Sequence, residues 1–576
     1  MKDWKAVLEA GGSLWIDEIR QSCENDPDSI PLYMRLELPD KSLRDIYAPL
    51  PQAESQEDWD FSLQYLSSTV FNLLSAYGGG RLEIFTDTGN EKLCALVRKL
   101  REVFQLDEKK RSGFGKCINV ADRISAAFGG EGFKLELKDI SDYCEISSPA
   151  QSAQRGLGQA LRQAAHRAET LCCCGIDVGG TDIKLALSVE GKLMSVKEFD
   201  WNPAASPVAE GYTEPIILLA RLMRARAAAE GTELASILEA LMPKEAALED
   251  IEREVSRAEE SLHVNVLDVI GLSFPDVVIE NRIVGGETPK TKSMRENPDI
   301  DYEAEFRKIG LIKERLEVLC KTPGCVHLTN DGNMAAFTAA MELAMERPEE
   351  IEKGVIAHSL GTDFGSGWLD ADGRIPGLSL EMYDFMLDMG SRDKQGYSLE
   401  DLRGVKNENS GLPGARRYLG QAGVFRMAWE KNPELLEGFI AQRDGVLLVP
   451  TEPEDMRKPC LEHLMQLAVK GNEQACDIFR MVGENFAHMS LEIDYILRPL
   501  SKVRYIFGRF VKNPRCFELI QEGSAKLMPE LELKAADDDL ALTPLMRELS
   551  ELKTVTVAQF AQAIGAIYYG VQQSGI

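Results

Sequence analysis

Residues Cys172 to Leu187 read CCCGIDVGGTDIKLAL and contain the most informative pattern of the chain. A short apolar run reaches an acid, Asp177, and the turn Gly179-Gly180-Thr181 follows it. A second alternating run then extends from Ile183 to Val189. This pattern predicts two strands joined by a tight turn, with a carboxylate on the first strand where the turn begins.

The turn is suited to bind a nucleotide phosphate. Two successive glycines present backbone N–H groups that a polyphosphate can approach closely, because no side chain stands in the way. Asp177 beside the turn can hold water on a Mg²⁺ ion that travels with the phosphates. Hairpins with paired glycines are also common without any ligand. Two later segments help to distinguish a phosphate site from a plain hairpin.

The first of these segments is Val326 to Ala336, VHLTNDGNMAA. An apolar, β-rich run ends at Asn330-Asp331, and a helix-like stretch opens at Asn333. Either polar residue can be the N-cap of that helix. A carboxylate at the end of a strand is also well placed to accept a proton from a substrate hydroxyl.

The second segment is Gly354 to Gly377, GVIAHSLGTDFGSGWLDADGRIPG. It predicts a strand, a second glycine-rich turn with a Thr hydroxyl, and a returning strand. The turn is suited to the far side of the same phosphates. The three motifs DxGGT, NDG and GTxxGxG occur in this order, the last about 30 residues after the acid, and this combination favours a phosphate site over three unrelated turns.

The three motifs together resemble the sugar kinase and hexokinase branch of the actin-like ATPases, and within it the ROK family of repressors and sugar kinases. The likeness extends from about Cys172 to Tyr569. It implies an α/β protein with the two-lobed actin-like ATPase fold, a duplicated ribonuclease H-like fold, here with an extra N-terminal α/β domain. It also implies phosphorylation of a sugar or sugar-like hydroxyl, with ATP and Mg²⁺ as cofactors.

The resemblance assigns roles by position. Asp331 is implied as the catalytic base, and Asp177 as the carboxylate that holds Mg²⁺ through water. The residues implied in nucleotide binding are Asp177, Gly179, Gly180, Thr181, Lys184, Gly361, Thr362, Gly365, Gly367 and Gly508. The residues implied in substrate binding are Asn330, Asp276 and Glu381. The Lys290-Thr291-Lys292 cluster in the same sugar-side loop as Asp276 is a further site candidate, although we interpret its lysines as solvated charges.

Some positions depart from the family pattern. Glu381 is followed by Met382-Tyr383-Asp384, where the family usually has Gly-His. The turn at Gly508 lacks the usual second glycine, so neither the sugar nor the nucleotide preference can be assigned. Cys172-Cys173-Cys174 lie within one expected strand, where alternating side chains cannot converge on one metal, and Cys320 and Cys325 have no second pair nearby. We therefore expect no structural zinc.

The composition is that of an ordinary globular protein, and 576 residues are too many for a single core. The net charge of −28 disfavours nucleic acid and anionic membranes as partners. We see no secretory h-region and no apolar run long enough to cross a membrane, so the twelve cysteines are expected to be reduced thiols in the cytoplasm. The expected partner is a small-molecule sugar, and the resemblance is compatible with a homodimer.

Three consecutive segments are expected. Residues 1–165 form an accessory α/β domain of unknown role, residues 170–345 a first ATPase lobe with a helical insertion at about 213–262, and residues 350–576 a second lobe with helix over 461–497. Strand-like runs in the first segment are Tyr33 to Leu38, Arg81 to Thr86 and Phe133 to Lys138. Because Ser147 to His166 is polar and rich in small residues, we expect a linker there and a first segment that can be separated from the chemistry.

Two other functions stay open. The chain can be a non-catalytic sugar- or nucleotide-binding regulatory protein of the same fold, or an ATPase that acts on a non-sugar substrate. Repressors of the family begin with a compact basic helix-turn-helix, whereas the first 165 residues here are mostly acidic and contain strand-like runs. Release of ADP with and without sugars distinguishes the three functions.

Overall fold

The structure is a computed structural model that describes residues 4–10, 12–109, 111–146, 156–286, 289–361, 364–377, 379, 381–390, 414–439, 441–443, 446–448, 456–536 and 540–575. It is a mixed α/β protein with several sheets, and its contacts divide it into two units. Unit 1 comprises Met1–Gln151, His358–Ser366 and Leu378–Ala535, and unit 2 comprises Ser152–Ala357, Gly367–Gly377 and Ala536–Ile576. Each unit joins stretches that are far apart in the sequence, and the expected division into three consecutive segments stays a prediction.

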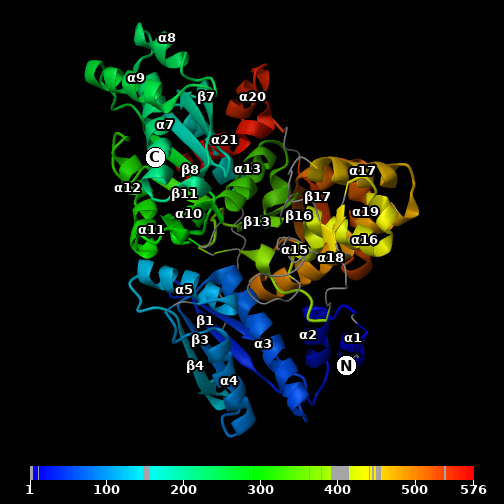
Figure 1. Ribbon diagram of the computed structural model, residues 1–576. Helices are drawn as coiled ribbons and strands as arrows, with labels where there is room; N and C mark the ends of the chain where they lie inside the picture. Colours follow the sequence, from blue (N-terminus) through cyan, green and yellow to red (C-terminus); the bar gives the residue numbers. More distant parts are fainter. Residues whose placement is uncertain are drawn as a thin grey trace. The chain divides into compact units, whose positions relative to one another are not determined.

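Unit 2 is built on a five-stranded sheet of order β11-β8-β5-β6-β7 (Figure 1). Strands β5 (Cys172–Val178), β6 (Asp182–Val189) and β7 (Lys192–Asp200) form an antiparallel meander, which confirms the hairpin expected at residues 172–189. Strands β8 (Val269–Phe274) and β11 (Val326–Asn330) run parallel to β5. The carboxyl ends of β5, β8 and β11 therefore share one edge of the sheet.

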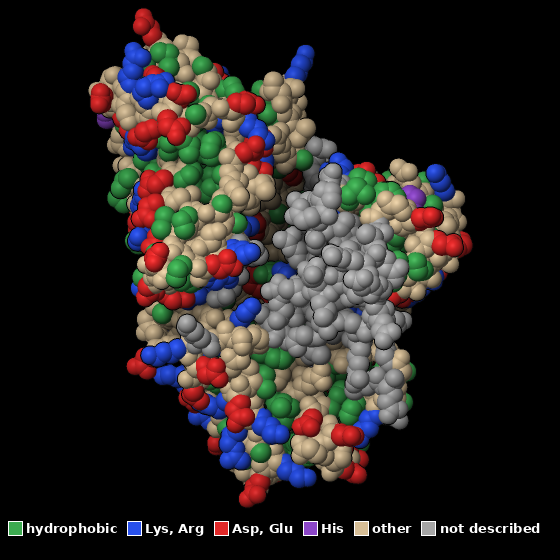
Figure 2. Space-filling view, in the orientation of Figure 1, with side chains coloured by type: hydrophobic (Ala, Val, Ile, Leu, Met, Phe, Trp, Pro, Cys, Tyr) green, Lys and Arg blue, Asp and Glu red, His purple; other side chains and the backbone are tan. Residues whose placement is uncertain are grey.

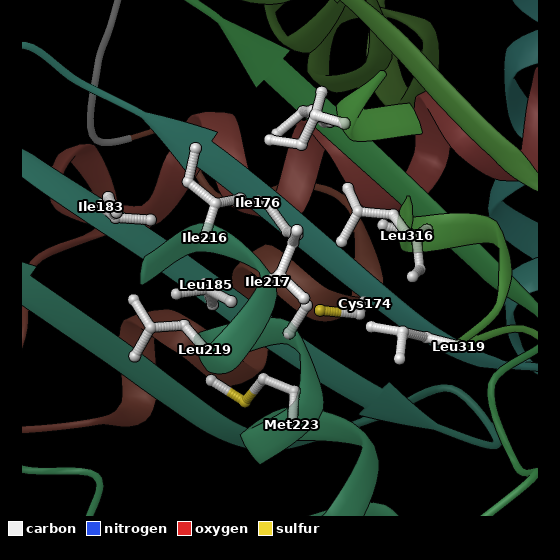
Figure 3. Close-up of a cluster of buried hydrophobic side chains, with 14 of the residues drawn as sticks. Cys174, Ile176, Ile183, Leu185, Ile216, Ile217, Leu219, Met223, Leu316 and Leu319 are labelled. Atoms are coloured by element: carbon white, nitrogen blue, oxygen red, sulfur yellow. The ribbon is translucent and has the colours of Figure 1, made fainter. Parts of the chain in front are cut away.

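One face of this sheet is covered by α7 (Glu210–Ala228) and α12 (Ile312–Glu317). Cys174 and Ile176 of β5 pack there against Ile216 and Ile217 of α7, in a fully apolar layer (Figure 3). The helical stretch expected at 213–262 is three helices, α7, α8 (Leu234–Glu239) and α9 (Leu248–Ser261). It is interrupted first at Gly231, whose φ of +77° is a left-handed conformation that does not continue a helix.

The opposite face of the sheet contacts α13 (Asp331–Glu346) and α21 (Val557–Ser574), which also pack against α6 (Leu157–Ala168). Gly175 of β5 and Gly271 of β8 are direct neighbours in the register of the two strands. A Cβ on Gly271 would lie 1.7 Å from the carbonyl oxygen of Ala566, and one on Gly175 would lie 1.8 Å from that of Ala563. Two adjacent glycines thus let the backbone of α21 rest on the strands.

Unit 1 contains most of a second sheet, of order β13-β12-β16-β17. Its strands are β12 (Val355–Leu360), β13 (Phe364–Leu369), β16 (Val503–Phe507) and β17 (Glu532–Ala535), and the division between the units passes through β12 and β13. The order repeats that of β6-β5-β8-β11: the second strand of a hairpin, its first strand, and then two later strands, which are parallel to each other in both sheets.

The second sheet is accompanied by α16 (Gln421–Lys431), α17 (Arg457–Val469), α18 (Glu473–Leu497) and α19 (Pro514–Leu527). The helix expected at 461–497 is interrupted between α17 and α18. Gly471 adopts a φ of +81°, and the side chain of Asn472 caps α18 by accepting the N–H of Ala475 at 3.0 Å. A left-handed glycine followed by an N-cap residue is a combined stop and start signal for helices.

The N-terminal part of unit 1 has a four-stranded sheet of order β2-β1-β3-β4. Its strands are β1 (Tyr33–Glu37), β2 (Leu43–Tyr47), β3 (Arg81–Thr86) and β4 (Lys134–Asp139), which confirms the three strand-like runs expected from the sequence. The helices of this part are α1 (Trp4–Glu9), α2 (Ile16–Glu24), α3 (Gln56–Tyr77), α4 (Glu91–Val103) and α5 (Lys116–Ala127).

This N-terminal part packs on α18 of the same unit. The Arg20 guanidinium of α2 forms a buried ion pair with Glu492 of α18. The Tyr77 hydroxyl of α3 donates to the Ile496 carbonyl at 2.8 Å, and the Tyr495 hydroxyl of α18 donates to the Tyr47 carbonyl at 2.7 Å. The contact is therefore specific and partly polar.

The described surface is mixed in charge. On the face shown in Figure 2, acidic and basic side chains of the described residues are interspersed. Within the described residues, the longest apolar helices are still too short or too polar to cross a membrane.

Candidate functional site

Three acidic residues lie at or just beyond the carboxyl ends of the three parallel strands of unit 2. Asp177 lies one residue before the end of β5, Asp276 two residues after β8, and Asp331 directly after β11. Because these strands run in the same direction, the three acids lie at the same edge of the sheet, where α/β proteins usually bind ligands. The charge of Asp331 is close enough to affect the ionisation of Asp177.

Asp177 has a raised pKa. Burial of its carboxyl is the main cause and raises the pKa to about 6, and the negative charges of Asp331 and Asp182 act in the same direction. A hydrogen bond from Ser273 and the charge of Lys184, which lies directly opposite Asp177 on β6, partly offset this rise. The ionised form of such a buried carboxylate is stabilised by a nearby cation.

We therefore expect the affinity for Mg-ATP to depend on the ionisation of Asp177. Because the carboxyl is protonated below about pH 6, affinity should rise about tenfold from pH 5 to pH 7 and then level off. The measurement is calorimetric titration at several pH values, with Asp177→Asn as the comparison, since the nucleotide titrates in both proteins. An equally steep pH profile in Asp177→Asn would contradict the assignment.

The Gly179-Gly180-Thr181 turn is held by backbone contacts and by Trp201. The N–H of Gly179 donates to the Asp182 carbonyl at 2.8 Å, and the Trp201 indole N–H donates to the Gly179 carbonyl at 3.1 Å. Gly180 and Thr181 are exposed, and neither glycine of the turn has a positive φ. The backbone conformation alone thus does not require these glycines. A Cβ on Gly179 would lie 2.9 Å from the Asp182 carbonyl oxygen, so packing within the turn explains this glycine, and close approach of a ligand remains a reason only for Gly180.

Lys290 is only partly exposed, whereas the sequence led us to expect a solvated lysine. Its Cε lies 3.3 Å from the position that a Cβ on Gly180 would occupy, and its ammonium lies 3.4 Å from the Pro275 carbonyl oxygen. Lys292, two residues further on, is exposed. The loop after β8 therefore brings one cation beside the glycine turn, which nothing in the local sequence around Lys290 indicates.

Lys290→Met is expected to weaken the affinity for ATP about tenfold, because it removes a charged donor beside the turn that is expected to bind the phosphates. Lys292→Met is the matched control, since it removes the same charge from the same loop and should leave affinity unchanged. Both affinities can be measured by calorimetry. Equal losses in the two variants would assign the effect to the net charge of the loop instead of to the position of Lys290.

The two polar residues at the end of β11 have different roles. Asn330 is the N-cap of α13: its Oδ1 accepts the N–H of Gly332 at 2.9 Å, and its Nδ2 donates to the Asp276 carbonyl at 3.0 Å. The Asp331 Oδ1 accepts the same N–H at 2.8 Å, and its side chain remains partly exposed. The cap is thus provided by Asn330, which leaves the exposed part of the Asp331 carboxylate available to a substrate.

Asp276 is buried and stabilises its own loop. Its Oδ1 accepts the N–H groups of Val277 at 2.8 Å and Gly286 at 3.1 Å, and these bonds close the loop that follows β8. Together with burial, the charges of Asp276 and Asp331 raise the pKa of Tyr212. The geometry explains Asp276 as a loop-forming residue, and its contact with a substrate stays a prediction.

The second glycine-rich hairpin lies at the division between the units. A Cβ on Gly367, in unit 2, would lie 1.9 Å from the carbonyl oxygen of Gly332, so packing against the first turn of α13 already explains this glycine. In unit 1, Gly508 has a φ of +99°, and a Cβ there would lie 2.3 Å from the Leu360 carbonyl oxygen. The turn after β16 is therefore next to the end of β12.

Gly361 has open space where a Cβ would be, and its carbonyl accepts the N–H of Gln421 at 3.0 Å. A Cβ on Gly365 would lie 2.7 Å from the Ser359 hydroxyl. Thr362 lies outside the described residues. The roles of all these positions in nucleotide binding stay predictions.

Glu381 belongs to a different part of unit 1. Its N–H donates to the Ser75 carbonyl of α3 at 3.0 Å, and its carboxylate is hydrogen-bonded to Tyr383. The ring of Tyr383 packs 4.1 Å from the Arg416 guanidinium, and burial together with the charge of Glu381 raises the pKa of Tyr383. Tyr383 lies where the ROK family usually has its Gly-His pair, and its phenol is hydrogen-bonded to Glu381.

One residue that contacts Asp177, Ser273, was not predicted from the sequence. The Ser273 hydroxyl is hydrogen-bonded to Asp177 and lies 3.3 Å from Oε1 of Gln562 in α21. The only signal for Ser273 is its register opposite Asp177 on a parallel strand, which the sequence alone does not fix. In the described part of the chain, no group of three or more His, Cys, Asp or Glu is arranged to hold a metal ion directly, so Mg²⁺ would depend on phosphate and water as well as on Asp177.

A surface hollow of about 810 Å³ lies elsewhere in unit 2, between α7, α9, α11 (Tyr302–Gly310) and α12. Arg221, Arg315, Ile217 and Val318 are among its lining residues, and none of the predicted site residues is. The hollow therefore shares no lining residue with the candidate site.

No family model matches the chain, and no curated protein sequence matches it. Among solved structures, a ROK family glucokinase from Streptomyces griseus, in complex with glucose and AMPPNP, is similar over 69% of this chain and 98% of its own, with 17% identity and a TM-score of 0.37. A ROK hexokinase from Thermus thermophilus is similar over 69% of this chain and 97% of its own, with 16% identity and a TM-score of 0.38.

A ROK family transcriptional regulator, a homolog of the E. coli Mlc protein, is similar over 70% of this chain and 81% of its own, with 12% identity and a TM-score of 0.38. The similar structures thus include carbohydrate kinases and a regulator. With TM-scores this low, these likenesses assign neither a fold nor an activity to the chain.

Proposed function

We propose that this protein is an ATP-dependent kinase that phosphorylates a hydroxyl group of a sugar or a sugar-like alcohol. The observation that supports it best is the position of Asp177 and Asp331 at one edge of the five-stranded sheet, beside the exposed Gly179-Gly180 turn. Phosphoryl transfer needs a phosphate cradle, a carboxylate for Mg²⁺ and a base for the substrate hydroxyl, and this edge offers all three.

In the proposed reaction, Asp331 accepts the proton of the substrate hydroxyl while the hydroxyl oxygen attacks the terminal phosphorus of ATP and ADP leaves. The backbone N–H groups of Gly180 and Thr181, together with Lys184 and Lys290, stabilise the negative charge of the phosphates. Mg²⁺, when bound, would neutralise part of that charge, and Asp177 would hold it through water. We assign Gly361, Thr362, Gly365, Gly367 and Gly508 to the nucleotide, and Asn330, Asp276 and Glu381 to the sugar.

We propose further that the chain has the two-lobed actin-like ATPase fold, with residues 1–165 as an extra N-terminal α/β domain. The repeated strand order of the two large sheets supports a duplicated fold. Each sheet also has a glycine-rich turn in its hairpin, at residues 179–180 in one and around Gly361 in the other.

The test is ADP release in the presence of Mg²⁺, with and without a panel of hexoses, N-acyl sugars and polyols. Release that depends on one class of sugar supports the kinase and names the substrate class. Release without any sugar points to an ATPase with another substrate. No release under any condition points to a regulatory protein and contradicts the proposal.

A further inference from the structure

The segment that carries Glu381 obtains many of its backbone hydrogen bonds from the N-terminal part of the chain. Besides the bond from Glu381 to Ser75, the N–H of Ile16 donates to the Leu387 carbonyl at 2.9 Å, and the N–H of Met389 donates to the Leu14 carbonyl at 2.9 Å. Residues 381–390 thus lie against α3 on one side and against the chain before α2 on the other, all within unit 1.

Asn72 of α3 is central to this contact. Its Nδ2 donates to the Met386 carbonyl at 3.0 Å and its Oδ1 accepts the Met386 N–H at 2.6 Å, so the side-chain amide pairs with the backbone as a neighbouring strand would. The same Nδ2 donates to Glu492 of α18 at 2.9 Å. Asn72 and Glu492 are fully buried, and Arg20 pairs with Glu492.

Because of this network, replacement of Asn72 by an apolar residue is expected to be costly in stability. A buried backbone N–H or C=O without a partner is costly, and so is a buried carboxylate that loses a donor. An apolar residue at position 72 would remove the hydrogen bonds that Asn72 makes to both polar groups of Met386. The segment from Glu381 to Met386, which includes the short 3₁₀ turn Met382–Asp384, would then lose one of its two attachments to α3.

We propose that Asn72 is a positioning residue for Glu381, so that the N-terminal part of the chain sets the geometry of the sugar side of the site. This inference rests on the proposed function, because it takes Glu381 to contact the sugar. In this proposal the N-terminal part acts through the backbone of residues 381–390, so its removal should weaken sugar binding as well as solubility.

The experiment compares Asn72→Ala with Leu93→Ala, which removes a buried side chain of α4 in the same N-terminal part. Hydrogen exchange without ligands should be about tenfold faster in peptides spanning residues 381–390 of Asn72→Ala, and unchanged there in Leu93→Ala. The sugar KM of Asn72→Ala should rise about tenfold while the affinity for Mg-ATP stays unchanged. Leu93→Ala should change neither.

Should Asn72→Ala fail to fold, Ser379→Ala is the milder variant. The Ser379 hydroxyl donates to the Ser75 carbonyl at 2.5 Å, two residues before Glu381, and its loss should act in the same direction. Unchanged exchange in 381–390, or faster exchange with an unchanged sugar KM, would overturn the inference. A wild-type protein without sugar-dependent turnover would overturn the proposed function instead, because the exchange measurement needs no substrate.

Discussion

The Asp331→Asn variant is expected to lose turnover by about 10²–10⁴-fold, the usual contribution of a general base. The amide oxygen can still accept the N–H of Gly332, and Asn330 still caps α13, so the first turn of the helix should keep its geometry. The affinity for Mg-ATP should stay within about threefold, because only the proton acceptor is lost. Single-turnover kinetics and calorimetry measure the two quantities separately.

Asp299→Asn provides the matched control for this variant. Asp299 is an exposed aspartate of the same unit and is not among the predicted site residues, so its substitution should leave turnover and affinity unchanged. If Asp331→Asn retained turnover within about threefold of the wild type, Asp331 could not be the base. If it lost ATP binding as well, Asp331 would have a role on the nucleotide that the proposed mechanism does not give it.

The Gly271→Val variant is expected to destabilise unit 2 by more than about 3 kcal/mol, because its Cβ alone would lie 1.7 Å from the Ala566 carbonyl oxygen. The contact is with the backbone of α21, so no side-chain rotation relieves it. Either α21 must leave the sheet or β8 must shift. Since β8 leads directly to Asp276 and pairs with β5, both changes should also abolish ATP binding.

Gly310→Ala is the control for a glycine in the same unit. A Cβ there would lie 3.6 Å from the Ile283 carbonyl oxygen, an ordinary contact distance, and stability should change by less than about 0.5 kcal/mol. Urea unfolding followed by circular dichroism gives both values. An unfolding midpoint of Gly271→Val equal to that of the wild type would contradict the close packing of α21 on the strands.

The hairpin at residues 172–189 could be predicted because its signal is local. Alternation of apolar residues on both sides of two glycines is sufficient to specify paired strands, and the structure has these strands with the expected turn. The position of Asp331 at the end of a strand could be predicted for the same reason. The proximity of Asp177 and Asp331 could not, since it depends on the order of the strands in the sheet.

The remaining features depend on contacts between distant residues. Lys290 reaches Gly180 through a loop that could have pointed into solvent, and Asn72 contacts Met386 across more than 300 residues. A single sequence shows neither register nor the packing of helices on a sheet. Helix ends were missed for a different reason: at Gly471-Asn472 the stop signal was present, but the apolar pattern continued on both sides of it.

The packing of α21 on Gly175 and Gly271 has a consequence for the synthesis of the protein on the ribosome. About 380 residues lie between the end of β5 and the start of α21. At the usual speed of translation, β5 therefore waits on the ribosome for about 20 to 75 seconds, and β8, which ends at Phe274, for about 15 to 55 seconds, before the helix that covers them has been synthesised. During that time one face of β5 and β8 lacks its cover, so the nascent chain is a natural client for chaperones that bind apolar segments, and a stop codon shortly before Val557 should yield an aggregating product.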